Sequence, residues 1–485
     1  MHAVNGLHEF EIQQGEEKMS KKMLYSLLAV LMITTLVLSA CGPAPTEAPT
    51  QAPATEAPAT EAPMTEAPTE APTEAPATEA PATDAPASGQ VEIFSWWVGG
   101  GEAAGLTAMT EVFAQQYPDI EFVNAAVAGG SGTNARAVLA TRLQANDPPD
   151  SWQAHAGQEI IGTYVAAGQV APLDDFFAET GFADVLPETL LPLISQDGSP
   201  YSVPVNIHRS NVMWYNPTVL EEAGVEVPTT WDEFFEVCNT LIAADRTCLA
   251  LGPQWTAMHL LENVMIGSLG AEGWNALWTE GADWSSAEVT AALENFSQAL
   301  SYTNTDAAQL ADWQPAAQLV TNGDAAFNIM GDWADGYFEN PAPDGLGLTP
   351  HEDFDWAPVP GTDGIFVFLS DSFVLPANAP NPEATNAWLT VAASKEGQEA
   401  FNPVKGSICA RTDCDQSLFN EYLQSAAADW TTDTVVGSLT HGVVANDAWK
   451  SKIDTALGLF LANPADVASF QTALVEACAS DGVCQ

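Results

Sequence analysis

The chain has 485 residues, 46% of them hydrophobic, and carries 64 acidic residues against 12 basic ones. This length suffices for one large two-lobed body or for two domains. The first 90 residues hold three of the basic and 12 of the acidic residues, which leaves nine and 52, a net charge of −43, for the remainder. Such a surface repels nucleic-acid phosphates and anionic lipid surfaces, so we exclude nucleic acid as a partner; a neutral ligand meets no such repulsion.

Residues 19–40 have the pattern of a lipoprotein signal peptide. They begin Met-Ser-Lys-Lys, run apolar from Met23 to Leu38 and end in Ser-Ala before Cys41. A basic start, an apolar run and a small-residue cleavage site are the parts of an export signal. Leu-Ser-Ala-Cys resembles a bacterial lipobox, and this resemblance implies that Cys41 becomes the lipid-bearing N-terminus. The alternative, a transmembrane helix, needs a longer apolar run.

Residues 1–18, upstream of this signal, are acidic and carry no targeting pattern. We interpret residues 1–18 as a mis-called upstream extension with Met19 as the true start, and a precursor peptide from 1–18 in mass spectrometry would contradict this. Residues 42–90 repeat Thr-Glu-Ala-Pro, which has almost nothing apolar to bury. With Cys41 they form a disordered tether, 41–90, that extends to about 150 Å at roughly 3.1 Å per residue. A mucin-like stalk is the alternative and has the same role.

Six of the seven cysteines remain once Cys41 is set aside, and they fall into three close pairs. Export favours disulfides between such neighbours. A metal site is the alternative, but no pair has Cys-x-x-Cys spacing and no histidine lies beside one at ligand spacing. We therefore predict disulfides in sequence order and no metal: Cys238–Cys248, Cys409–Cys414 and Cys478–Cys484.

From residue 91 onward, strand-like and helix-like stretches alternate. The strand-like stretches are 91–97, 119–127 and 150–155, and the helix-like ones are a stretch ending near residue 117, then 134–144 and 158–167. This alternation predicts an α/β fold whose βα units build a mostly parallel sheet.

A second α/β region follows an extended crossing at 201–215. Thr230 and Glu233 have capping-box spacing and open a helix to about Ala243. Helical periodicity returns at 258–269, 288–302, 381–394, 415–430 and through most of 445–480, with an extended return at 353–375. Extended crossings between two α/β regions predict two lobes with a ligand cleft between them: 91–206 plus about 357–408, and about 207–356 plus 409–485.

The segment from Gly323 to Trp333 resembles the Gly-x-Ala-Ala-x4-Gly-x-Trp signature of family 1 extracellular solute-binding proteins of ABC importers. Segments 93–97, 153–157, 203–215, 370–373, 401–407 and 437–442 narrow the resemblance to thermophile glucose/mannose-binding proteins. It covers about 91–460 and implies a two-lobed periplasmic-binding-protein-like fold that closes over its ligand by a hinge. The three cysteine pairs, the acidity and an extra glycine in 99–101 depart from the family pattern.

The resemblance implies a binding protein, not an enzyme, that needs no cofactor. It implies capture of a monosaccharide (glucose- or mannose-like) or a short oligosaccharide and delivery to ABC transporter permease subunits. We expect a monomer on the extracellular face of the cell membrane, periplasmic if a second membrane is present, that meets the membrane only through its lipid anchor.

A sugar offers C–H faces to aromatic rings and hydroxyls to charged or planar hydrogen-bonding groups. Trp96 and Trp97 end a predicted strand, where ligands of open α/β sheets bind, although core packing is the alternative for each. By resemblance Trp333 is the stacking indole of the second lobe. Trp313, which begins the helix before it, is a second aromatic wall or a core residue.

Candidate hydroxyl partners come from several separate segments. Helix capping, a buried structural histidine and turn formation are the respective alternatives for Glu102, His155 and Asp371. Lys405 donates to hydroxyls or pairs with Asp371. We interpret His208 and Arg209, in the crossing segment, as supports of the hinge or cleft. By resemblance the hydroxyl partners are Glu102, Gln153, His155, Asp371, Lys405 and His441.

Two rival functions remain at this point. A secreted glycoside hydrolase needs two positioned carboxylates, but acids are so abundant here that finding a pair carries no information. The run Gly129–Thr133 fails the Gly-x-Ser-x-Gly pattern at its last position, and no His-Glu-x-x-His occurs. A surface lipoprotein without a transport role is the second rival, because its stalk would look the same.

Overall fold

The computed structural model describes residues 89–484. The predicted upstream extension, signal peptide, Cys41 and nearly all of the tether lie outside this range. Among the described residues, none of the helices combines the length and the apolar character that crossing a bilayer requires.

The first sheet has the strand order β2-β1-β3-β13-β6. Strand β1 pairs in parallel with β2 and β3, as the βα alternation predicts. Strand β13 pairs antiparallel with β3 and with β6, so the expectation of a mostly parallel sheet is wrong. The chain enters β6 from a short ribbon at 195–200 and enters β13 directly from the strand at 365–369, so neither strand follows the helix of a βα unit, which is what sets neighbouring strands parallel. The bounds are β1 (Gly89–Phe94), β2 (Ile120–Asn124), β3 (Ser151–His155), β6 (Ser202–Pro204) and β13 (Asp371–Val374).

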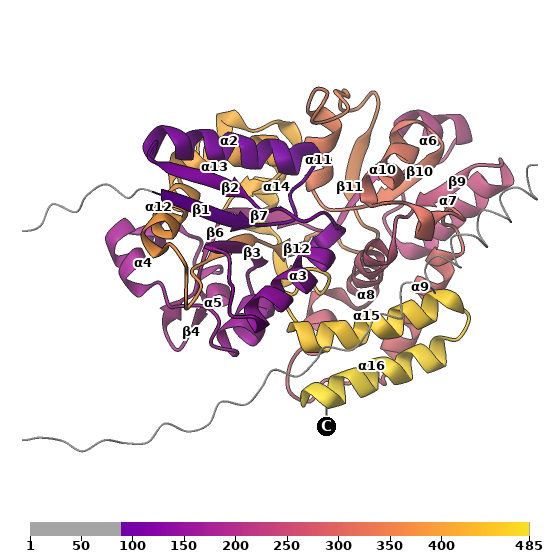
Figure 1. Ribbon diagram of the computed structural model, residues 1–485. Helices are drawn as coiled ribbons and strands as arrows, with labels where there is room; N and C mark the ends of the chain where they lie inside the picture. Colours follow the sequence, from indigo (N-terminus) through magenta and orange to yellow (C-terminus); the bar gives the residue numbers. More distant parts are fainter. Residues whose placement is uncertain (1–88, 485) are drawn as a thin grey trace, which may run out of the picture. The chain divides into compact units, whose positions relative to one another are not determined.

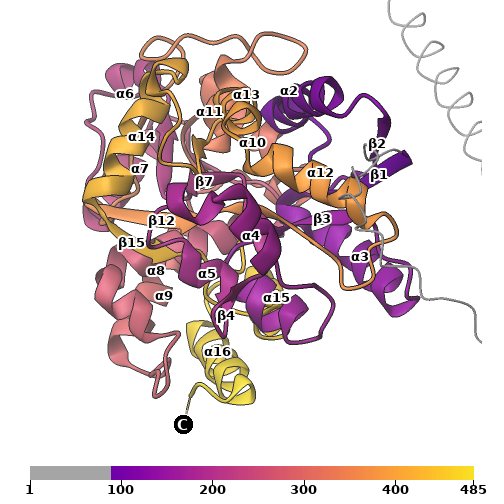
Figure 2. The same ribbon diagram turned by 90° about the vertical axis from the view of Figure 1, so that its left-hand side faces the viewer.

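Two further sheets complete the α/β architecture. One has the order β11-β8-β10-β9, and the other, β14-β7-β12-β15, is built around the crossing strands β7 and β12 (Figure 2). Their bounds are β7 (Asn206–Arg209), β8 (Val212–Tyr215), β9 (Thr247–Ala250), β10 (Ala325–Ile329), β11 (Asp355–Pro358), β12 (Ile365–Leu369), β14 (Ile408–Cys409) and β15 (Thr434–Gly437); β4 (Ser195–Gln196) and β5 (Ser199–Pro200) form a small ribbon. The β6–β7–β8 and β12–β13 segments each run from one sheet into another, which is the predicted crossing pattern.

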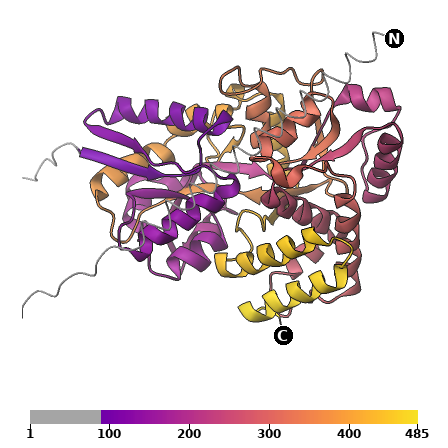
Figure 3. The same ribbon diagram turned by 45° about the vertical axis from the view of Figure 1, so that its right-hand side comes forward.

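Helices cover the sheets and pack in pairs, such as α2 with α13 (Figure 1) and α15 with α16 (Figure 3). Those of the first region are α2 (Gly100–Gln116), α3 (Thr133–Gln144), α4 (Asp174–Thr180), α5 (Leu191–Ile194), α12 (Pro382–Ala393) and α13 (Lys395–Lys405). The others are α6 (Pro217–Ala223), α7 (Trp231–Ala243), α8 (Gln254–Ala276), α9 (Ala287–Leu300), α10 (Trp313–Thr321), α11 (Trp333–Glu339), α14 (Glu421–Thr432), α15 (Asp447–Ala462) and α16 (Val467–Asp481).

Local signals account for several helix boundaries. The Thr230 side chain accepts a hydrogen bond from Glu233 N at 3.2 Å and begins α7, as predicted. The Glu233 carboxylate accepts a hydrogen bond from Thr229 N at 2.9 Å, not from Thr230 N as a capping box requires. The helix expected at 415–430 begins only at Glu421, because Asp415 caps a short turn through Ser417 N at 3.0 Å.

Buried apolar side chains form two large cores. The first, around Phe113, Trp152 and Trp388, lies mainly on the first sheet. The second, around Trp274 and Phe296, fills the region of α8, α9 and α15. The first core also takes in Trp214, Trp333 and Phe338 from the second predicted lobe, so buried packing continues across the junction between the lobes.

The three predicted disulfides are confirmed. Cys238 at 0% exposure in α7 bonds Cys248 in β9, and the other two bonds join Cys409 to Cys414 and Cys478 to Cys484. The first bond ties a helix to the sheet that it covers, so it constrains the second core directly.

We expect the double substitution C238A/C248A to lower the free energy of unfolding by about 2–3 kcal/mol, because the unfolded chain regains the freedom of the closed loop. Urea unfolding followed by tryptophan fluorescence measures this change. The wild-type protein unfolded in reductant is the matched control. A double variant with the midpoint of the oxidised wild type would contradict the expectation.

Candidate ligand-binding site

One cavity of about 370 Å³ collects side chains from segments far apart in the sequence. Its volume lies at the lower end of the usual range for small-molecule sites, about 300–1,000 Å³. Of the ten predicted ligand-binding residues, eight line it: Trp96, Glu102, His155, Trp313, Trp333, Asp371, Lys405 and His441.

Strand ends and helix ends position these side chains. His155 is the last residue of β3 and pairs in register with Asp371, the first residue of β13. Glu102 lies in the first turn of α2, and Lys405 is the last residue of α13, which packs against α2. The Lys405 Nζ atom lies 3.6 Å from Glu102 Oε1. Both pairs, His155 with Asp371 and Glu102 with Lys405, therefore line the same cavity.

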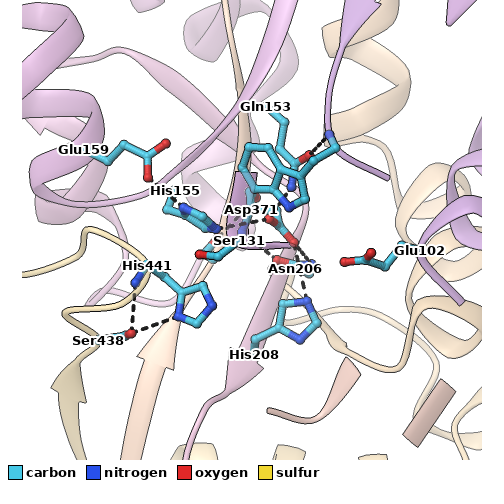
Figure 4. Close-up of polar contacts among 12 residues, drawn as sticks. Glu102, Ser131, Gln153, His155, Glu159, Asn206, His208, Asp371, Ser438 and His441 are labelled. Carbon is cyan, nitrogen blue, oxygen red and sulfur yellow. Dashed lines mark hydrogen bonds and ion pairs between the residues drawn. The ribbon is translucent and has the colours of Figure 1, made fainter. Parts of the chain in front are cut away.

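Asp371 is the hub of the polar network (Figure 4). Its carboxylate accepts hydrogen bonds from Gln153 Nε2 at 2.7 Å and from Asn206 Nδ2 at 2.8 Å. His208 Nε2 lies 3.4 Å from the same carboxylate. Burial alone would raise the pKa of Asp371, but the hydrogen bond from His208 and the charge of Lys405 outweigh burial and hold this pKa below its usual value. Asp371 is thus an ionised, fixed acceptor.

Trp97 and Gln153 do not line the cavity. Trp97 is 1% exposed, and its ring lies 4.9 Å from Phe401 and 5.7 Å from Phe373, so it packs in the core. Gln153 lies behind the cavity wall. It accepts a hydrogen bond from Trp96 N at 3.3 Å and donates to Asp371, so it positions both of them.

The indoles that line the cavity are held by close packing. A Cβ on Gly331 would lie 2.2 Å from the Trp333 ring, so only glycine leaves room for that indole. The Trp333 ring centroid lies 5.2 Å from that of His441 and 5.4 Å from that of His208. Trp313 packs on Tyr337 at 5.3 Å. Fixed indoles offer a flat apolar surface at little cost in side-chain entropy.

Glu159, which is paired with Arg136, orients the ring of His155. Its Nδ1 atom lies 2.7 Å from Glu159 Oε2, and Arg136 NH1 lies 3.6 Å from the same oxygen. Burial would raise the pKa of Glu159, but His155 and Arg136 reverse the shift and lower it. Glu159 begins a π-helix, Glu159–Val165, where the sequence predicts an ordinary helix. With Nδ1 taken up by Glu159, the Nε2 atom is the one available to Asp371, 3.7 Å away, and to the cavity.

Glu262 of α8 holds the loop that carries His441. Its carboxylate accepts hydrogen bonds from Leu439 N at 2.8 Å, Thr440 N at 2.9 Å and Ser438 Oγ at 2.9 Å. Ser438 Oγ in turn lies 2.9 Å from His441 Nδ1. The ligating atoms of His259, Glu262 and His441 lie within 4.8 Å of one another, a spacing that suits a metal, but the Glu262 oxygens already accept these hydrogen bonds. The cluster is a loop anchor.

His208 lines the cavity, whereas the sequence interpretation makes it only a support. Its Nδ1 bonds Asp332, and its Nε2 lies 3.2 Å from Lys405 Nζ. Burial would lower the pKa of His208, but the charge of Asp332 outweighs burial and raises it. The period-2 alternation of Asn206 and His208 along β7 is the signal that identifies this inward face. Arg209 points away from the cavity and pairs with Asp429, as a support does.

The sequence reasoning missed several further lining residues. Trp255 Nε1 donates to Asp312 Oδ1 at 2.9 Å, and both residues line the cavity. These residues carry no local motif, so only the folded chain brings them to the site. They are Gly130, Ser131, Asn134, Trp255, Asp312 and Gln314.

Comparison with known proteins identifies the family. The model of the bacterial extracellular solute-binding protein family matches residues 97–399, and the chain belongs to that family. It is 31% identical over 398 residues to an uncharacterized ABC transporter extracellular-binding protein of Pyrococcus horikoshii, covering 81% of this chain and 88% of the relative. It is 30% identical over 396 residues to the xylose/arabinose-binding protein XacG of Haloferax volcanii, covering 80% and 84%.

Solved structures share the two-lobed fold of sugar-binding receptors. The bacterial solute receptor AcbH, reported to prefer β-D-galactopyranose, superposes with a TM-score of 0.70 at 17% identity over 81% of this chain and 99% of its own. A chitin oligosaccharide binding protein gives 0.69 at 19% identity, covering 81% and 99%. At this identity the likeness shows the fold alone. The family match identifies the chain, at the family level, as an extracellular binding protein and not an enzyme.

The histidine behind Trp333 generates a prediction about acid stability. Burial lowers the pKa of His259 to about 3, against 6.5 when unfolded. As the pH falls from about 6.5 toward 3, His259 takes up a proton in the unfolded chain but stays neutral in the folded protein. The free energy of unfolding therefore decreases as the pH is lowered. We expect H259N to reduce the slope of unfolding free energy against pH by about 1 kcal/mol per pH unit between about pH 4 and 6.

Urea unfolding at a series of pH values measures this slope. H351N is the control, because Asp355 raises the pKa of the half-exposed His351 and gives it a contribution of opposite sign. An H259N slope equal to that of the wild type would contradict the assignment of a neutral His259.

Proposed function

We propose that the chain captures a glucose- or mannose-like monosaccharide in this cavity and delivers it to an ABC transporter permease. The convergence of indoles with a fixed carboxylate, a lysine and histidines in a cavity of about 370 Å³ supports this proposal most directly. The ligands named for one relative and one structural neighbour, xylose or arabinose and β-D-galactopyranose, are single sugars, whereas another structural neighbour binds a chitin oligosaccharide.

The apolar faces of a sugar ring fit the cavity indoles. Trp333 and Trp313 come from the second region and Trp96 from the first, so a ring between them is held from two sides. The ring centroid of Trp96 lies 5.1 Å from that of His155, which brings the aromatic wall next to a polar group. A sugar needs these two kinds of surface side by side.

The hydroxyls find acceptors and donors that are already oriented. Asp371 and Glu102 accept, Lys405 donates, and His155 and His441 each keep one ring nitrogen away from their structural partner. Groups fixed before binding cost little ordering entropy when the sugar arrives.

We further propose that binding closes the two lobes by a hinge. The first lobe is 91–206 with about 357–408, and the second is about 207–356 with 409–485; the segments β6–β7–β8 and β12–β13, which pass from one sheet to another, support this division. Helix α14 lies at the junction, because its Tyr422 and Leu423 pack into the first core. The crossing strands β7 and β12 are the hinge candidates, and a ligand touching both lobes favours the closed form.

A glycoside hydrolase is the rival that one observation favours. Burial raises the pKa of Glu102, while that of Asp371 is lowered, and a protonated acid beside an ionised carboxylate is what glycosidases use. Lys405 contacts Glu102 and lowers its pKa in part, which suits a hydrogen-bond acceptor better than a proton donor. Product analysis after incubation with glycosides distinguishes the two functions, and released sugar would favour the hydrolase.

Calorimetry against glucose, mannose, galactose, xylose and short glucans tests the proposed function. We expect one monosaccharide to bind best, and W333A to weaken it by about 2–4 kcal/mol, because the platform of the second lobe is lost. W430A is the matched control, because the indole of Trp430 packs on Phe366 at 5.2 Å and is absent from this cavity. Near-native sugar binding by a folded W333A protein would remove the proposed platform.

We also propose that Cys41 anchors the protein by lipid. The Leu-Ser-Ala-Cys quartet supports this. We expect the wild-type precursor, expressed in a bacterium, to incorporate a labelled fatty acid and to sediment with membranes. C41S is expected to do neither, because it lacks the sulfur that carries the lipid. Equal labelling of C41S and wild type would contradict the anchor.

A further inference from the structure

Gly130 brings the loop between β2 and α3 into contact with the second lobe. A Cβ on Gly130 would lie 2.1 Å from Trp255 Nε1 and 2.3 Å from Asp312 Oδ1, far below any real contact of this kind. The φ of Gly130 lies outside the left-handed region, so an alanine there strains no backbone. The need for glycine at this position therefore comes only from how closely the two lobes approach.

The wall that Gly130 meets is rigid. Asp312 Oδ1 accepts hydrogen bonds from Trp255 Nε1 and from Trp313 N, each at 2.9 Å. Through the second of these bonds Asp312 caps α10. If either Trp255 or Asp312 moved away from residue 130, the hydrogen bond between them would break. A side chain added at residue 130 is therefore accommodated at the lowest energetic cost when the two lobes move apart.

The loop that carries Gly130 is itself held in shape. Asn134 Nδ2 donates to Ala128 O at 2.9 Å, which ties the start of the loop to α3. Ser131 has a φ of 51°, an uncommon conformation for a residue with a side chain. Its Oγ donates to Thr440 O of the second lobe at 3.5 Å. The loop thus makes two neighbouring contacts across the cavity, and both require the lobes to be close.

We propose that Gly130 determines ligand length: its contact with Trp255 and Asp312 closes this end of the cavity around a single sugar ring. The inference rests on the proposed sugar-binding function and names the ligand class within it. A single ring leaves the Gly130 contact intact and gains from closure. A second ring occupies the space where the loop meets Asp312, so it binds only with the lobes apart and forfeits that contact.

The test compares one-ring and two-ring sugars on full-length protein by calorimetry. The probes are D-glucose and D-xylose, with maltose and xylobiose as their two-ring counterparts. We expect the wild type to prefer the single ring, and G130A to weaken that ring about tenfold or more while leaving the two-ring sugar nearly unchanged. A change in the ratio of the two dissociation constants is a readout that a general loss of stability does not produce.

Two more variants complete the design. W430A removes an indole that packs on Phe366 and is absent from the cavity, so it can lower stability without altering the site, and we expect it to keep the wild-type ratio. D312A frees the loop from the opposite lobe without altering residue 130, so it should shift the ratio in the same direction as G130A. It therefore tests the inference even if G130A fails to fold.

The outcomes are distinguishable. A wild type and W430A that bind none of the four sugars would remove the proposed function and this inference with it. A wild type that binds a single ring, with G130A and D312A keeping its ratio or weakening both sugar classes equally, would overturn the role of Gly130 and leave sugar binding intact. A wild type that prefers the two-ring sugar would overturn the length limit.

Discussion

The buried carboxylate of Asp371 is the group on which the site depends. A buried charge is tolerated only when it is paired and hydrogen-bonded, and removing one partner is costly. Asp371 is 3% exposed, and its partners come from β3 and β7. Satisfying this one charge brings together Gln153, Asn206, His155 and His208, so two strands from the first sheet and one crossing strand are fixed at a single point.

The same requirement arranges the remainder of the cavity. Strand β7 carries His208 toward Asp332, next to the indole of Trp333, and so links the first lobe to the platform of the second. Glu262 repeats the device on the other side, where one buried carboxylate gathers the 438–441 loop and presents His441. Each buried carboxylate thus needs several hydrogen-bond donors, and satisfying that need fixes the position of a side chain that lines the cavity.

Strand ends and signature residues were predictable from the sequence, whereas contacts between distant segments were not. The strand that ends near His155 and the signature glycine before Trp333 are visible in the sequence, but the resemblance to the family's segments is what predicts that His155, Trp333 and Asp371 share a site, and the three do line one cavity. Trp97 was assigned to it because the strand was expected to run to residue 97. The strand ends at Phe94, and the chain then turns the Trp97 indole into the core.

The few buried basic residues of this acidic chain lie beside carboxylates. Lys405 is 2% exposed and Arg136 and Arg209 are 14% and 7% exposed at the side chain, each beside a carboxylate. Basic residues on a surface of this charge would be screened and worth little, whereas a cation beside a buried acid removes a large desolvation cost. Each of these three cations is already paired with a carboxylate, and the net charge of the surface repels an anionic ligand. The electrostatics of the chain therefore favour a neutral, hydroxyl-rich ligand independently of the indole platforms.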